Sequence, residues 1–192
     1  MKAKTIMGWV GVGSFILLVT FSVWRSQQAP VIQIKEESKV PIEREAADIK
    51  SIPVIGSDWS DRFLIGNNHY RDMDHKVPLI RSSILDDSAQ KKAIIIAKSN
   101  TFAHVVPGMR LFSDTMGESG ILDRRGQTVG ENLICGWAWQ EPEELMKILY
   151  ESPEHKENIV FDRYRYVGFG YSLMTVEGWP CVVVVTHYAV VL

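Results

Sequence analysis

Cysteine and an excess of positive charge are what this sequence most clearly lacks. Its 192 residues include only Cys135 and Cys181, too few for a disulfide scaffold or a four-thiolate zinc site. Lysine and arginine total 21 against 23 acidic residues, so no basic surface for nucleic acid is expected. A G-x-S-x-G elbow, a phosphate-binding loop and a Cys-x-x-Cys pair are also missing. With 46% apolar and 23% charged residues, the composition is that of a globular protein.

One long apolar run lies near the N-terminus. Residues 5–24 (TIMGWVGVGSFILLVTFSVW) contain no charged side chain and would form a helix about 30 Å long, enough to cross a membrane. Lys2 and Lys4 precede the run and Arg25 follows it, so the positive-inside rule predicts a cytoplasmic N-terminus and an exported remainder. We expect residues 1–25 to be an uncleaved signal-anchor. A cleaved signal peptide and a buried soluble helix are the alternatives, although no A-x-A cleavage site follows the run.

Residues 26–58 have the composition of a charged linker. Pro30, Pro41 and Pro53 interrupt the segment, and a sustained helical or alternating pattern is confined to a short helix near 43–50. The near-neutral total charge is therefore a sum of three parts. Residues 1–25 carry +3, the linker carries −2, and residues 59–192 carry −3.

Residues 59–192 show the patterns of one folded domain. Helices are predicted over 61–72, from Asp86 to about residue 100, and from Pro142 to about residue 152. Residues 104–130 are expected to be loop with at most a short helix. Strands are predicted over 132–139, 166–174 and 181–191, with a turn at Gly178-Trp179-Pro180 joining the last two into a hairpin. The fold class is therefore α+β, with helices around a small antiparallel sheet.

Six short motifs follow one another along this domain. They are N-H-Y-R at 68–71 with V-P-L at 77–79, Leu85 with Ala89 and Ala93, F-A-H at 102–104, G-E-N-L at 130–133, S-P-E-H-K-E-N-I at 152–159, and V-G-F-G-Y at 167–171. In this order they resemble the CAP superfamily (cysteine-rich secretory proteins, antigen 5 and pathogenesis-related 1), and in particular its short bacterial SCP-like members. The resemblance covers about residues 61–192 and implies an α-β-α sandwich, which agrees with the predicted elements.

The resemblance also implies a central cleft. In the family, two histidines and two glutamates line this cleft and can hold a divalent metal. His104, Glu131 and His155 match three of these positions, whereas the fourth, a glutamate, falls near Ser152. Glu151 or Glu154 could substitute for it, but the motif establishes neither.

Three hypotheses remain open for these residues. The first is a hydrogen-bonded cluster that braces the cleft, with Glu131 tying loops together. The second is metal binding, because two imidazoles and a carboxylate are good zinc ligands and leave a position for water. The third is a catalytic metal. It has less support, because the residues are far apart in sequence and form no i, i+4 pair such as H-E-x-x-H.

The other polar and aromatic residues are assigned structural places. Free, buried thiols are favoured over a disulfide, because the sequence does not show whether the strands that hold the two cysteines are neighbours. We expect surface positions for His69, His75, Arg124, Arg125, Arg163 and Arg165, and packed positions for His187, Trp137 and Trp139. The alternative for these arginines is binding of anionic envelope polymers. The alternative for the two tryptophans is binding of a sugar or an apolar ligand.

The leading functional hypothesis is an extracytoplasmic CAP domain on a membrane anchor, either periplasmic or at the cell surface. It would bind a lipid, a cell-envelope component or a protein partner through the cleft lined by His104, Glu131 and His155. A metal-dependent hydrolase that uses these three residues to activate water is the alternative from another class. A structural spacer in an envelope assembly is the third. Cleavage after the apolar run would give a secreted protein instead.

Overall fold

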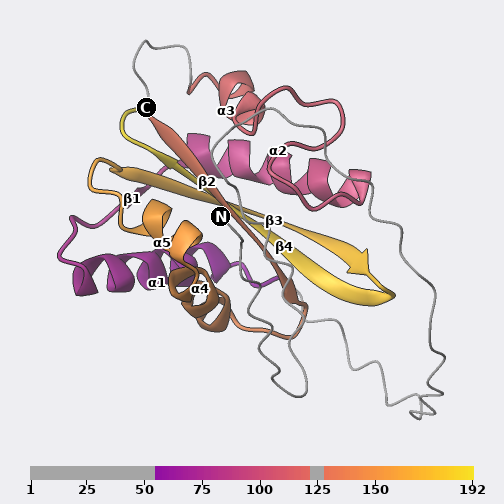
Figure 1. Ribbon diagram of the computed structural model, residues 1–192, viewed down its shortest axis with the longest axis horizontal. Helices are drawn as coiled ribbons and strands as arrows, with labels where there is room; N and C mark the ends of the chain where they lie inside the picture. Colours follow the sequence, from indigo (N-terminus) through magenta and orange to yellow (C-terminus); the bar gives the residue numbers. More distant parts are fainter. Residues whose placement is uncertain (1–54, 122–127) are drawn as a thin grey trace, which may run out of the picture.

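In the computed structural model the described residues are 55–121 and 128–192, and a four-stranded sheet runs through them (Figure 1). The elements are α1 (Trp59–Met73), β1 (Ile80–Arg81), α2 (Ser83–Ser99), α3 (Asp114–Glu118), β2 (Val129–Trp137), α4 (Pro142–Glu151), α5 (Pro153–Ile159), β3 (Tyr166–Val176) and β4 (Trp179–Ala189). The expected membrane anchor, almost all of the linker and the Arg124-Arg125 pair lie outside these residues. Within the described ranges, no helix is long and apolar enough to span a bilayer.

The sheet has the strand order β1-β3-β4-β2. β3 and β4 form the predicted antiparallel hairpin, and β2 pairs antiparallel with the other edge of β4. β1 pairs parallel with β3, so the sheet is mixed rather than purely antiparallel. The sequence did not predict β1, because a strand of two residues is too short to show an alternating pattern.

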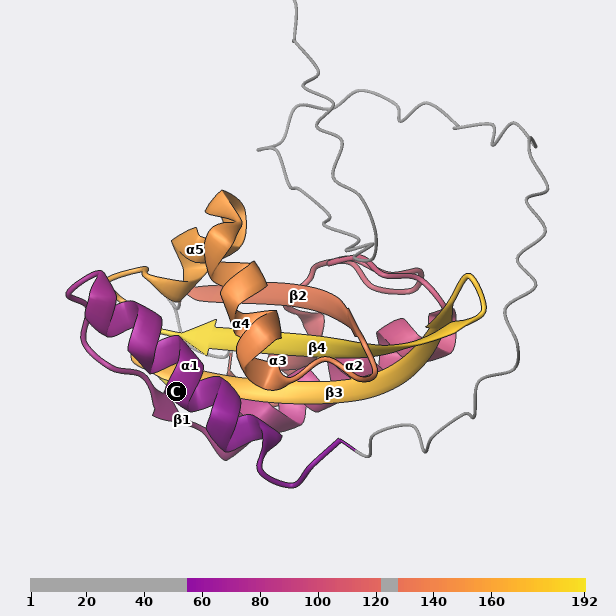
Figure 2. The same ribbon diagram turned by 90° about the horizontal axis from the view of Figure 1, so that it is seen from below.

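Helices cover both faces of the sheet, as the resemblance implies (Figure 2). Alternate residues of β4 point to opposite faces. Val182 and Val184 pack into the core formed with α1, α4 and α5, whereas Val183 and Val185 pack into the core beneath α2. The strand is buried along both faces, which explains why VVVV is a continuous apolar run rather than an alternating one.

Beyond the end of β1, side chains of α2 form hydrogen bonds with the backbone of β3. The carboxylate of Asp86 accepts a hydrogen bond from the N–H of Phe169 at 2.8 Å. The amide of Gln90 accepts from the N–H of Tyr171 at 3.0 Å and donates to its carbonyl at 2.8 Å. These bonds satisfy backbone groups of β3 beyond the short β1 pairing, and they fix α2 along the sheet.

The N-x-x-R motif of α1 ties the helix to distant loops. The amide of Asn68 exchanges two hydrogen bonds with the backbone of Leu79, at 2.7 and 3.0 Å. Arg71 is fully buried, and its guanidinium donates to the carbonyls of Val77 and Ile159 at 2.7 Å each. The motif therefore fastens the segment before β1 and the end of α5.

Several predicted boundaries were wrong. The hairpin turn consists of Glu177 and Gly178, both with positive φ (51° and 85°), because a two-residue turn of this kind matches the twist of the strands. Trp179 and Pro180 therefore belong to β4. The second helix begins at Ser83 rather than Asp86.

The first strand of the antiparallel group also ends earlier than predicted. β2 stops at Trp137, and Trp139 lies in the following turn with 56% of its surface exposed. Its ring stacks on Trp137, with centroids 5.5 Å apart. A packed position was therefore wrong for Trp139, whereas the surface positions of His69, His75, Arg163 and Arg165 are confirmed.

Cys135 and Cys181 form a disulfide, which corrects the expectation of free thiols. Cys135 lies opposite Val183 and Cys181 lies opposite Trp137, so the two cysteines are diagonal neighbours on adjacent strands. Their Cα atoms are 5.9 Å apart, within the reach of a bridge. The pairing of β2 with β4, which the sequence did not reveal, is the reason for the difference.

Candidate functional site

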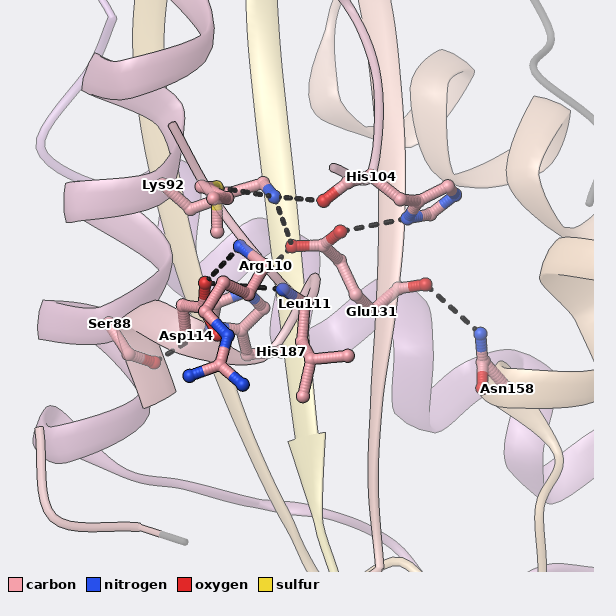
Figure 3. Close-up of polar contacts among 10 residues, drawn as sticks. Ser88, Lys92, His104, Arg110, Leu111, Asp114, Glu131, Asn158 and His187 are labelled. Atoms are coloured by element: carbon pink, nitrogen blue, oxygen red, sulfur yellow. Dashed lines mark hydrogen bonds and ion pairs between the residues drawn. The ribbon is translucent and has the colours of Figure 1, made fainter. Parts of the chain in front are cut away.

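Glu131 on β2 is the centre of a buried polar cluster (Figure 3). Its side chain is 1% exposed, and each carboxylate oxygen meets an imidazole nitrogen. His104 Nδ1 lies 2.8 Å from Oε1, and His187 Nε2 lies 2.9 Å from Oε2. His187 is the register partner of Glu131 on β4, so the pairing of the two strands brings these side chains together. An ionised carboxylate only accepts hydrogen bonds, and both imidazole nitrogens therefore donate.

The cluster continues from His187 to α2. His187 Nδ1 lies 2.7 Å from the hydroxyl oxygen of Ser88, and this hydroxyl is also 3.0 Å from the carbonyl of Leu85. The sequence Ser88–His187–Glu131 has the residue types of a catalytic triad. Ser88 is completely buried, however, so its hydroxyl cannot reach a substrate. The chain of bonds therefore braces α2 against the sheet.

Lys92 brings a buried positive charge to the same centre. Its ammonium lies 3.8 Å from Glu131 Oε2, and both side chains are at most 1% exposed. It donates hydrogen bonds to the carbonyl of His104 and to the sulfur of Met109. Burial lowers the pKa of Lys92, and the negative charge of Glu131 opposes this effect.

The carboxylate of Glu131 is held ionised by its surroundings. Burial alone would raise its pKa, but hydrogen bonds from His104 and His187 and the charges of His187 and Lys92 lower it below the ordinary value. The cluster therefore combines one anion with several donors, and its stability depends on all of them.

His155 lies on α5, the helix that packs against β2 at the edge of the sheet. Its Nδ1 is 2.8 Å from the hydroxyl of Ser152, and the ring also forms a hydrogen bond with the Leu133 backbone. Burial and the nearby His104 lower the pKa of His155, whereas the Leu133 bond opposes them. A neutral imidazole with its hydrogen bonds made inside the fold is what these contacts indicate.

Two asparagines fasten α5 to β2. The amide of Asn132 donates to the carbonyl of His155 at 2.9 Å. The amide of Asn158 donates to the Glu131 carbonyl at 3.1 Å and to Asn132 Oδ1 at 2.8 Å. G-E-N-L and the S-P-E-H motif are therefore joined directly, which accounts for the asparagine in each of them.

An open cleft of about 450 Å³ lies between these elements. Its lining residues are His104, Val105, Leu111, Phe112, Val129, Gly130, Glu131, Asn132, Glu154, His155, Glu157 and Asn158. One wall is the loop before α3, which Asp114 holds by accepting from the N–H groups of Arg110 and Leu111 at 2.6 and 3.2 Å. The structure thus places His104, Glu131 and His155 around one cleft. Ser152 is not among the lining residues, but its hydroxyl bonds to His155.

Sequence reasoning missed Ser88 and Lys92 and treated His187 as packing alone. Ser88 and Lys92 belong to the buried stripe of α2, together with Leu85, Ala89 and Ala93. A lysine at a core position of an amphipathic helix was the available signal, because a buried lysine almost always has a partner. The partner could not be identified without the pairing of β2 and β4.

Neither proposed substitute for the fourth glutamate joins the cluster. Glu151 is 63% exposed at its side chain and lies 3.7 Å from the ammonium of Lys147. Glu154 is exposed and lines the cleft from α5. At Ser152, the position near which the resemblance implies a carboxylate, the hydroxyl bonds to His155.

The layered fold is one that known structures share. An outer surface protein from Borrelia burgdorferi has 15% identity and a TM-score of 0.55, over 70% of this chain and 95% of that one. An extracellular protein with an SCP domain from Bacillus anthracis has 14% identity and a TM-score of 0.52, over 68% of this chain. This chain spans about two fifths (39%) of the length of the Bacillus protein. No family model and no curated protein matches the sequence.

These likenesses concern the fold, because the identities are low. The described domain has the fold of the SCP, or CAP, proteins, which is the fold that the sequence resemblance implies.

The divalent metal that the resemblance implies does not fit this set of donors. Both oxygens of Glu131 accept from imidazoles, and the Lys92 ammonium lies beside one of them. His155 is engaged by Ser152 and by the Leu133 backbone. Among the residues that the structure describes, no three His, Cys, Asp or Glu side chains are grouped so as to hold a metal ion.

Proposed function

We propose that this chain is a membrane-anchored extracytoplasmic protein that binds a ligand in the cleft between β2, α5 and the loop before α3. One observation carries the proposal, namely an open cleft of about 450 Å³ whose polar floor is fixed by buried hydrogen bonds. Ligand sites of proteins are usually preformed concave pockets of about 300–1,000 Å³. A lipid, another envelope component and a segment of a protein partner are the candidate ligands.

The walls of the cleft favour a ligand with an apolar body. Val105 and Leu111 are 42% and 60% exposed, and Phe112 and Val129 are half-buried beside them. The lining also includes the exposed carboxylates of Glu154 and Glu157, which can accept hydrogen bonds from the polar end of a ligand. An amphipathic molecule such as a lipid combines both features and is therefore the first candidate.

The location outside the cytoplasm is supported by three features. Residues 5–24 have the length and composition of a membrane span, and Lys2 and Lys4 precede it, the charge pattern expected when the N-terminal end is cytoplasmic. The two similar structures belong to a protein described as extracellular and a protein described as an outer surface protein. The disulfide between Cys135 and Cys181 is consistent with an oxidising compartment.

The hydrolase hypothesis has no comparable support. A metal-activated water needs ligands that are open to the metal, and the imidazoles and the carboxylate of the cluster bond to one another or to the fold. The serine in the cluster is inaccessible. The geometry therefore favours binding over catalysis.

Filling the cleft tests the proposal. Leu111→Trp adds bulk to the cleft wall, whereas Leu173→Trp makes the same change at an exposed β3 position outside the lining residues. Native mass spectrometry of the full chain, released from detergent micelles, should detect a bound small molecule in the wild type and in Leu173→Trp. In Leu111→Trp, bound molecule should fall by about tenfold, a loss of roughly 1.4 kcal/mol. Equal occupancy in all three proteins, or a wild type without any adduct, would contradict binding in this cleft.

A further inference from the structure

The Glu131 centre already contains a cation from its own chain. Lys92 extends from the core-facing stripe of α2, and its ammonium lies 3.8 Å from Glu131 Oε2. Its side chain is 0% exposed, so solvent does not screen the pair. The neighbouring Lys91, by contrast, is partly exposed and pairs with Asp87 at the surface.

The position of Lys92 is fixed from three sides. Its ammonium donates to the carbonyl of His104 and to the sulfur of Met109, in addition to facing the carboxylate. The same lysine thus holds both the anion of the cluster and the backbone of the loop that carries His104 (Figure 3). Two of its N–H donors make hydrogen bonds inside the fold, and its charge faces the carboxylate of Glu131.

Each oxygen of the carboxylate also accepts a hydrogen bond from an imidazole. His104 Nδ1 and His187 Nε2 each donate to one oxygen, at 2.8 and 2.9 Å. A divalent ion bound to the carboxylate would lie beside the Lys92 ammonium, which repels it. Buried charges need a partner, and Glu131 has one without a metal.

We infer that Lys92 is the resident cation of the Glu131 centre and that it takes the electrostatic place that a divalent metal could occupy, so that the centre works without metal. This departs from the metal site that the resemblance implies. The inference does not depend on which ligand the cleft binds.

Zinc titration of the full, tag-free chain tests the inference. The probes are Zn²⁺ alone and the variants Lys92→Met and Lys91→Met, which remove a buried and a partly exposed ammonium of neighbouring residues. Wild type and Lys91→Met should show no saturable zinc binding by calorimetry and no zinc-dependent change in melting temperature. Lys92→Met should melt at a lower temperature than the wild type, and micromolar Zn²⁺ should raise that temperature part of the way back.

A second variant makes the zinc effect specific. In Lys92→Met with Glu131→Gln the carboxylate is gone, and zinc should no longer raise the melting temperature. Failure of zinc to stabilise Lys92→Met, or equal stabilisation of the double variant, would overturn the inference. If Lys92→Met does not fold, zinc binding by the wild-type protein still tests the inference. Saturable micromolar zinc binding that Glu131→Gln abolishes would overturn the inference, and its absence would support it.

Discussion

Glu131→Gln is expected to lower the free energy of unfolding by about 3–5 kcal/mol, because it leaves the Lys92 ammonium buried without an anion. The substitution keeps the size of the side chain but removes the charge. It also replaces one acceptor oxygen with an amide that no longer accepts from both His104 and His187. Denaturant unfolding of the full chain, followed by tryptophan fluorescence, measures the loss.

Glu157→Gln is the matched control for this variant. Glu157 is an exposed carboxylate of α5 that lines the same cleft, and its substitution should change stability by no more than about 0.5 kcal/mol. An equal effect of the two substitutions would mean that the buried cluster contributes nothing particular to the fold.

The stability difference between wild type and Glu131→Gln should also depend on pH. The native pKa of Glu131 lies below its ordinary value of 4.5, so the stabilisation by the ionised carboxylate is fully present above pH 4.5. It is lost as the pH falls through the lowered native pKa. A difference that instead grew on acidification below pH 4.5 would contradict the assigned direction.

Gly170→Ala is expected to cost about 3 kcal/mol, the upper end of the usual range for overpacking, because the close contact is with backbone atoms that cannot move aside. A Cβ on Gly170 would lie 2.2 Å from backbone atoms of Ala89 and Gln90. The strand and α2 would have to separate, and α2 carries Ser88 and Lys92 of the polar cluster. Thermal unfolding followed by circular dichroism measures the loss of stability.

Gly66→Ala provides the comparison for that experiment. Gly66 lies within α1, and an added Cβ would meet only the Met146 side chain, at 3.0 and 3.3 Å. A flexible methionine can move, and alanine favours the helix by about 0.5–1 kcal/mol over glycine. Gly66→Ala should therefore leave stability almost unchanged. A Gly170→Ala protein as stable as Gly66→Ala would show that α2 does not pack against β3 as closely as described.

Much of the fold could be predicted from the sequence, because the long elements have strong patterns. The helix beginning at Pro142 and the strand with VVVV were located within a few residues. The disulfide was missed because it depends on a diagonal contact between β2 and β4, strands whose pairing no local pattern reveals. The two-residue β1 was missed because it is too short for periodicity.

The candidate site was predicted in part. The family motifs supplied His104, Glu131 and His155, and the structure gathers these residues around one cleft. The motifs did not supply Lys92 or His187. In this chain Lys92 forms an ion pair with the buried carboxylate of Glu131, and His187 donates a hydrogen bond to it. Polar residues at core positions become interpretable only when their partners across the sheet are known.

The central claim is that the His/Glu cluster is a hydrogen-bonded brace with Lys92 as its cation. Nitrogen-15 NMR of the full chain, labelled only at histidine, tests it most directly, since a nitrogen bound to metal changes its resonance. On addition of one equivalent of Zn²⁺, the ring signals of His104, His155 and His187 should stay where they are. A zinc-dependent shift of the His104 and His155 signals that Glu131→Gln abolishes would contradict the account.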